Sequence, residues 1–189
     1  MIDYSTTKLK FKEIISNTVH REGIDKLMSW LESTDFYTAP ASARGHGAES
    51  CGLCAHSIGV YTALKAMQTT ESDETIAIVS LFHDLCKVNF YKTSMRNTKD
   101  DSGQWIKVPY YEYRQDDPLP IGHGEKSVIL LMKYIDLTDE EILAIRWHMG
   151  GYYTSNPGES QAIGQALSQS HLVLKLQTAD QMSAFWYNI

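Results

Sequence analysis

Long apolar segments are missing from this 189-residue sequence. A membrane-spanning helix needs about 18 or more consecutive apolar residues, and no such run is present. The first ten residues, MIDYSTTKLK, are too polar for a signal peptide, so we expect a cytoplasmic protein that does not bind membranes. With 43% apolar and 21% charged residues, the composition is that of a globular chain. Its length fits one domain around a single core.

Cysteine and positive charge are both scarce. The three cysteines, Cys51, Cys54 and Cys86, are an odd number, which argues against a disulfide framework in a chain without an export signal. Cys51 and Cys54 form a CxxC pair, but no second pair completes a four-cysteine zinc site. Seventeen basic against 23 acidic residues give a net charge of -6, which argues against a protein that coats nucleic acid through bulk electrostatics.

The spacing of apolar residues predicts an all-α protein. A capping box at Thr138 and Glu141 opens one helix, which Gly150 and Gly151 end shortly after His148. The other helices are expected over residues 8–19, 23–31, 53–67, 76–90, 124–134 and 171–186. We expect a single domain over residues 1–189, with N-terminal helices in 1–35 and a metal-site core in 45–187.

Two segments interrupt the helical pattern. Residues 36–52, FYTAPASARGHGAESCG, contain a proline, three glycines and small residues, and are expected to form a long loop. In residues 93–120, two extended runs flank the turn signal DDSG, which predicts a short β-hairpin projecting from the helices. Aromatic residues of this hairpin either stack on a nucleobase or pack on the body of the protein: Trp105, Tyr110, Tyr111 and Tyr113.

Ionisable residues occur at positions that should be buried. The segment LFHDLCKV, residues 81–88, places a histidine, an aspartate and a lysine in an otherwise apolar helix, where unpaired burial is costly. Other expected helices carry similar groups beside apolar positions: His56, His123, His148 and Asp180. One divalent metal ion can satisfy imidazole nitrogens and carboxylate oxygens together, and both are ordinary ligands of Zn, Mn, Fe, Co or Ni.

These residues resemble the signature of a known superfamily. CAHSIGVY, LFHDLCKVNFY and LQTADQMSA occur in the order of the H...HD...D signature of the HD superfamily of metal-dependent phosphohydrolases. IGHGEKSV and IRWHMGG resemble the additions of the longer H...HD...H...H...D form, which in that superfamily holds two metals. The likeness spans about residues 45–184. RGHGAESCGLCAHSIGVY and WHMGGYYTSNPG most resemble the HD module of bacterial 3'-to-5' exoribonucleases, but this chain has no room for their usual nucleic-acid-binding domain.

The resemblance implies an HD-domain-like helical bundle with the hairpin as an insertion. It also implies one or two divalent ions (Mn, Fe, Zn, Co or Ni, with Mg not excluded) and hydrolysis of a phosphomonoester, phosphodiester or phosphoanhydride bond in a nucleotide-like substrate. The implied metal ligands are His56, His83, Asp84, His123, His148 and Asp180. Asp84 is expected to bridge two ions, because one carboxylate has two oxygens to share. If only one ion binds, His123 and His148 would face the substrate instead.

Three basic residues are candidates for contact with the substrate. Lys87 lies at i+4 from His83 and i+3 from Asp84, so its ammonium can reach the same site, unless it extends to solvent. His46, in the loop sequence RGHG, is expected to contact a phosphate or to protonate a leaving group. Arg44 can bind phosphate with its forked guanidinium. We therefore expect Asp84, Lys87 and His46 to take part in catalysis.

Two other functions remain open from the sequence. The same six ligands resemble those of the mixed-valence di-iron oxygenases of the HD superfamily, such as myo-inositol oxygenase, which cleave C–C or C–P bonds with O2. A non-catalytic module with a structural metal is the other alternative, although such a site needs only about four ligands. As partners we expect a small nucleotide-like substrate, while a nucleic-acid end as substrate and a homodimer also stay open.

Overall fold

The computed structural model describes residues 3–67, 70–153 and 157–185. This part of the chain is mostly helical and contains one two-stranded antiparallel sheet. The α-helices are α1 (Tyr4–Thr18), α2 (Ile24–Glu32), α3 (Gly52–Ala66), α4 (Asp73–Phe82), α5 (His123–Leu131), α6 (Asp139–Trp147), α7 (Pro157–Gln169) and α8 (His171–Phe185). None of these described helices is long and apolar enough to cross a membrane.

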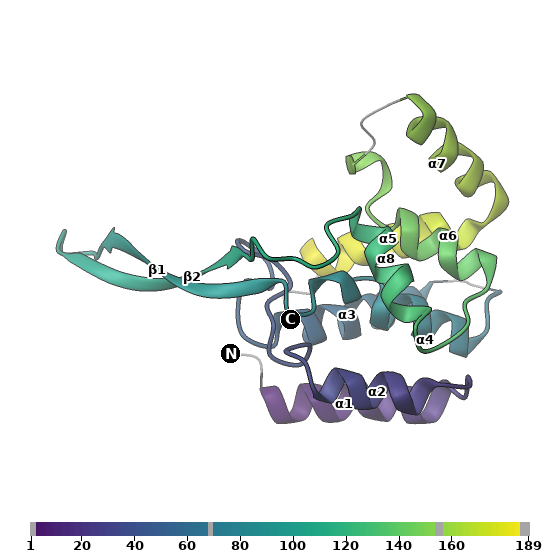
Figure 1. Cartoon of the computed structure of the whole chain (residues 1–189), viewed down its shortest axis with the longest axis horizontal. Helices are drawn as coiled ribbons and strands as arrows, with labels where there is room; N and C mark the ends of the chain where they lie inside the picture. Colours follow the sequence, from purple (N-terminus) through teal and green to yellow (C-terminus); the bar gives the residue numbers. More distant parts are fainter. Residues whose placement is uncertain (1–2, 68–69, 154–156, 186–189) are drawn as a thin grey trace.

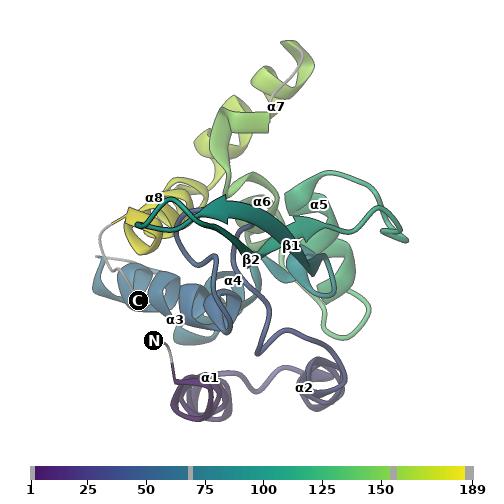
Figure 2. The same cartoon turned by 90° about the vertical axis from the view of Figure 1, so that its left-hand side faces the viewer.

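Apart from α7, which projects away from the others, the described helices lie in three layers, with α3 and α4 in the middle (Figures 1 and 2). On one side of them lie α1 and α2, and on the other lie α5, α6 and α8. Every residue of α4 from Ile76 to Phe82 is buried, because helices pack against it from both sides. The carboxyl end of α4 therefore lies in the interior of the molecule.

Local side-chain caps fix where several helices begin. Asp3 accepts a hydrogen bond from the backbone N–H of Thr6 at 2.7 Å at the start of α1. At the start of α6, the predicted capping box is present: Thr138 accepts from the Glu141 N–H, and the Glu141 side chain accepts from the Thr138 N–H. Glu141 is fully buried and also pairs with Arg21, so this cap joins α6 to the segment between α1 and α2.

The predicted β-hairpin is confirmed. Strand β1 (Tyr91–Lys99) pairs with β2 (Trp105–Tyr113), from Tyr91 opposite Tyr113 to Lys99 opposite Trp105. The hairpin projects away from the helices (Figure 1). Trp105 at its tip is 70% exposed, so this residue does not pack on the body of the protein.

The prediction of one continuous helix over residues 76–90 is wrong. Helix α4 ends at Phe82, and after His83 and Asp84 the chain continues in a 3-10 turn, η1 (Leu85–Lys87). The imidazole of His83 lies with Nδ1 2.8 Å from the carbonyl oxygen of Ser80, where it can donate the hydrogen bond that the ending helix no longer supplies. Apolar residues resume at Leu85, directly after His83 and Asp84, so the spacing of apolar residues gives no sign of this break.

Helix α7 was not predicted. Its first residue is Pro157, a position that proline favours at the start of helices, and Glu159 lies in the first turn. Ala166 of α7 packs with Trp147 and Val173 in an apolar cluster separate from the main core. The proline and the acidic residue in the first turn were signals for this helix in the sequence. The expected residue Trp186 at the end of α8 lies outside the described residues.

Candidate metal centre

Six side chains from five segments meet at the carboxyl end of α4. They are the six residues predicted as metal ligands: His56 in α3, His83 and Asp84 after α4, His123 at the start of α5, His148 directly after α6, and Asp180 in α8. Their ligand atoms form three overlapping groups, and within each group the atoms lie within 4.8 Å of one another: His56, His83 and Asp84; His83, His148 and Asp180; Asp84, His123 and His148.

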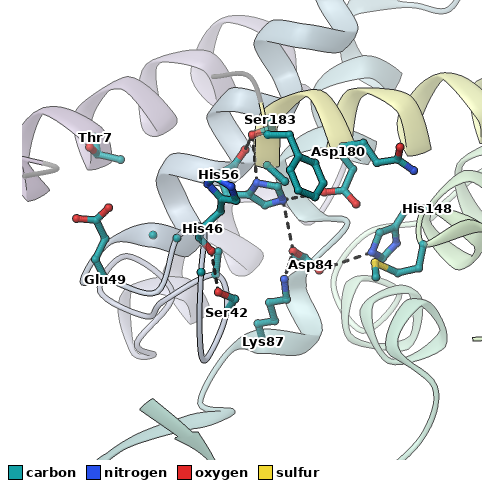
Figure 3. Close-up of a pocket in the computed structure, with 18 of the residues that line it drawn as sticks. Thr7, Ser42, His46, Glu49, His56, Asp84, Lys87, His148, Asp180 and Ser183 are labelled. Atoms are coloured by element: carbon teal, nitrogen blue, oxygen red, sulfur yellow. Dashed lines mark hydrogen bonds and ion pairs between the residues drawn. The ribbon is translucent and has the colours of Figure 1, made fainter. Parts of the chain in front are cut away.

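Asp84 lies between two pairs of histidines, His56 with His83 and His123 with His148 (Figure 3). Its Oδ2 lies 3.3 Å from Nε2 of His83 and 3.7 Å from Nε2 of His56. Its Oδ1 lies 2.7 Å from Nε2 of His123 and 3.6 Å from Nε2 of His148. Each carboxylate oxygen thus faces a different pair of imidazoles, and Oδ2 also pairs with the Lys87 ammonium at 2.5 Å.

Backbone carbonyls orient two of the imidazoles. Nδ1 of His83 lies 2.8 Å from the Ser80 carbonyl oxygen, and Nδ1 of His148 lies 2.7 Å from the Ile145 carbonyl oxygen. Each Nδ1–H donates to its carbonyl, so each Nε2 points into the centre. Both Nε2 atoms are buried, and neither makes a hydrogen bond to any residue that the structure describes. Unpaired buried nitrogens beside carboxylates fit a metal ion, which would satisfy them without any further protein group.

A third imidazole is held by a hydroxyl group. Ser183 Oγ lies 3.1 Å from Nδ1 of His56 and donates to the His56 carbonyl oxygen at 3.1 Å. On its other side, Nε2 of His56 lies 2.9 Å from Oδ1 of Asp180. Ser183 was not predicted as a site residue, although its position three residues after Asp180 places it on the same face of α8.

The electrostatics of the centre favour positive charge between its carboxylates. Burial alone would raise the pKa of Asp84, but Lys87 and His83 outweigh it and hold that pKa well below its usual range. Burial lowers the pKa of His83, but the Asp84 and Asp180 carboxylates reverse this and raise it to about 10. Burial lowers the pKa of His123, which favours the neutral imidazole that binds metals. The field that holds a proton on His83 would equally attract a metal cation.

Helices α5 and α6 approach each other closely beside His123 and His148. A Cβ atom placed on Gly124 would lie 2.2 Å from the carbonyl oxygen of Arg146. Any larger residue at this position would therefore force α5 away from α6. His123 precedes Gly124, and His148 follows Arg146 by two residues, and the two imidazole rings lie with their centroids 5.4 Å apart.

The centre opens into a cleft of about 930 Å³. Four of the six ligand residues line it: His56, Asp84, His148 and Asp180. Lys87 lines it too, and its Nζ lies 2.5 Å from Oδ2 of Asp84, as the sequence predicted from their spacing. The cleft gives a small molecule direct access to the centre.

The loop candidates are placed differently from one another. His46 lines the cleft, whereas Arg44 is exposed and does not line it. The hydroxyl of Ser42 lies 2.7 Å from the carbonyl oxygens of both residues and can donate to either, which holds the loop in a tight turn. The ring of His46 packs edge-to-face against Phe185 with centroids 5.5 Å apart, a neighbour that the sequence did not predict.

Comparisons of this chain with models of known protein families, with curated proteins and with solved structures found no match. The three histidine and aspartate groups can hold a metal ion, and they are compatible with an HD-type site.

Proposed function

We propose that this chain is an HD-type, metal-dependent phosphohydrolase that cleaves a phosphomonoester, phosphodiester or phosphoanhydride bond of a nucleotide-like substrate. One observation carries the proposal: Lys87 places its ammonium 2.5 Å from the Asp84 carboxylate, beside the metal-ligand groups and in the wall of the cleft. A divalent ion that binds Asp84 would compete with this ammonium for the carboxylate, and the displaced ammonium would then need another anion as its partner. A phosphoryl group is such an anion, because its oxygens can contact both the ion and the lysine.

The side chains of the centre have separate tasks in this proposal. The imidazole nitrogens and the two carboxylates would hold one or two divalent ions of Mn, Fe, Zn, Co or Ni. A bound ion supplies Lewis-acid charge that activates water and neutralises charge developing on the phosphoryl oxygens. Lys87 would bind the phosphoryl group and orient it by hydrogen bonds from its ammonium. The Ser80 and Ile145 carbonyls keep the imidazoles of His83 and His148 in fixed positions.

The cleft favours a catalytic over a purely structural role for the metal ion that the centre would bind. A structural metal is enclosed by its protein ligands, whereas a catalytic metal keeps a position open to the substrate. Here His56, Asp84, His148 and Asp180 all line the cleft, so a ligand can reach the groups that would hold the ion.

Metal content and turnover, measured on one preparation, test the proposal. Protein purified without oxygen would be analysed for bound metals by mass spectrometry, then assayed on a nucleotide panel with Mn, Co, Ni or Fe. Hydrolysis of at least one nucleotide of the panel that needs the metal but not O2 is expected. Bound iron with turnover that consumes O2 would make the chain a di-iron oxygenase instead. Phosphate release that survives complete removal of metal would exclude this centre.

A further inference from the structure

The cleft extends well beyond the metal centre. Asp84 and His148 lie at one end of it, while Glu49 and Thr7 lie at the opposite end (Figure 3). Asp3, one helical turn before Thr7, lines it as well. A substrate whose phosphoryl group contacts Lys87 therefore has room for a large organic group between the centre and Glu49.

The charges of the cleft limit how many phosphates it can bind. Lys87 is the only lysine or arginine among the described residues that line it, and it is already paired with Asp84. The far end carries the carboxylates of Asp3 and Glu49 instead. A second or third phosphate would find no further lysine or arginine among the described lining residues and would meet like charges at the far end, which oppose binding.

An aromatic pair lines the cleft, and Figure 3 shows one member of it, His46, between Glu49 and Asp84. His46, from the loop before α3, and Phe185, at the end of α8, meet with an interplanar angle of 72°. Phe185 is 67% exposed although it is large and apolar. An exposed phenyl ring in the wall of a cleft offers a surface on which a flat heterocycle can stack.

We infer that the cleft selects a phosphomonoester with a flat, hydrogen-bond-donating organic group, the chemistry of a nucleoside monophosphate. The phosphoryl group lies at Lys87 and the metal centre, the ring stacks on Phe185 beside His46, and amino or hydroxyl groups donate to Glu49. This inference rests on the proposed function and narrows its substrate to compounds with a single terminal phosphate.

Two measurements on metal-loaded protein test this subsite. The first is kcat/KM for the mono-, di- and triphosphates of adenosine and for glycerol phosphate, which has no ring. The value of kcat/KM for adenosine monophosphate should exceed that for the triphosphate by about tenfold or more. The second is equilibrium binding of adenosine monophosphate, which needs no turnover. Phe185→Ala should weaken this binding about tenfold, the typical loss of one stacking contact.

Matched variants separate the subsite from general effects. Leu174→Ala removes another exposed apolar side chain of α8, 56% exposed and outside the cleft, and should change neither measurement. Glu49→Lys should raise kcat/KM for the triphosphate, whereas Glu13→Lys, an equal charge change at an exposed position of α1 outside the cleft, should not.

The outcomes distinguish the two proposals. Preference for the triphosphate, or equal effects of Phe185→Ala and Leu174→Ala on adenosine monophosphate binding, would overturn the inference even if hydrolysis occurs. Failure of every phosphate compound to be hydrolysed would overturn the proposed function. In that case, weaker binding of adenosine monophosphate to the Phe185→Ala variant would still support the subsite. Equal binding to the wild type and the variant would overturn it.

Discussion

Asp84→Asn is expected to remove most of the stabilisation that divalent ions give to this protein. The substitution keeps the size of the buried side chain but removes the charge that faces four imidazoles. Two of the three potential metal-binding groups contain Asp84. The remaining group offers one carboxylate only, so the affinity for the ion should fall by about 100-fold or more.

The expected size of the effect follows from mass action. An ion that binds only the folded state stabilises it by about 2.7 kcal/mol when its concentration is about 100 times Kd. For a chain of this length, about 1 kcal/mol changes Tm by roughly 2–4 °C, so the ion should raise the wild-type Tm by about 5–11 °C. If Kd rises about 100-fold in the variant, the same ion concentration adds only about 0.4 kcal/mol, or about 1–2 °C.

The assay compares thermal unfolding in EDTA with unfolding in Mn, Fe, Zn, Co or Ni, together with metal content per chain by mass spectrometry. Asp117→Asn is the matched control, because Asp117 is also a carboxylate in a close ion pair, with Lys126 at 2.6 Å, but lies outside the centre. It should keep the full increase in Tm. The reasoning is refuted if Asp84→Asn retains the wild-type increase and metal content, or if none of the ions raises the wild-type Tm.

Three further predictions test other parts of the centre. Lys87→Met should lower kcat/KM about 100-fold while metal content stays at the wild-type level, and parallel loss of metal would contradict a role in substrate binding. Gly124→Ala should push α5 away from α6, since its Cβ would lie 2.2 Å from the Arg146 carbonyl oxygen; it should reduce the number of ions bound per chain, and unchanged stoichiometry would contradict this. His83 has its pKa raised to about 10 in the metal-free fold, because nearby carboxylates outweigh the lowering by burial. The folded state therefore holds a proton that the unfolded chain releases above about pH 6.5, and this contribution to stability is lost as pH rises through about 10. Urea unfolding in EDTA should show lower stability at pH 9.5 than at pH 6.5, and a rise over this range would refute the assignment.

Local sequence signals predicted most of the secondary structure. The capping box at Thr138 and the turn signal of the hairpin each depend on residues within a few positions of one another, so they can be read without knowledge of the fold. The break after Phe82 could not be read in this way. Apolar residues resume directly after His83 and Asp84, and the chain leaves the helix where these two residues turn toward side chains from four other segments.

The sequence by itself determined the types of the six candidate ligands and their order along mostly helical segments. Only the tertiary structure decided that each oxygen of Asp84 faces a different pair of histidines, that the centre opens into a cleft, and that Phe185 rather than Arg44 lines it. The physical reason is the distance along the sequence between the residues that interact. Helix periodicity fixes the direction of a side chain relative to its own helix, whereas distances of 3–4 Å between side chains depend on how distant helices pack, as at Gly124.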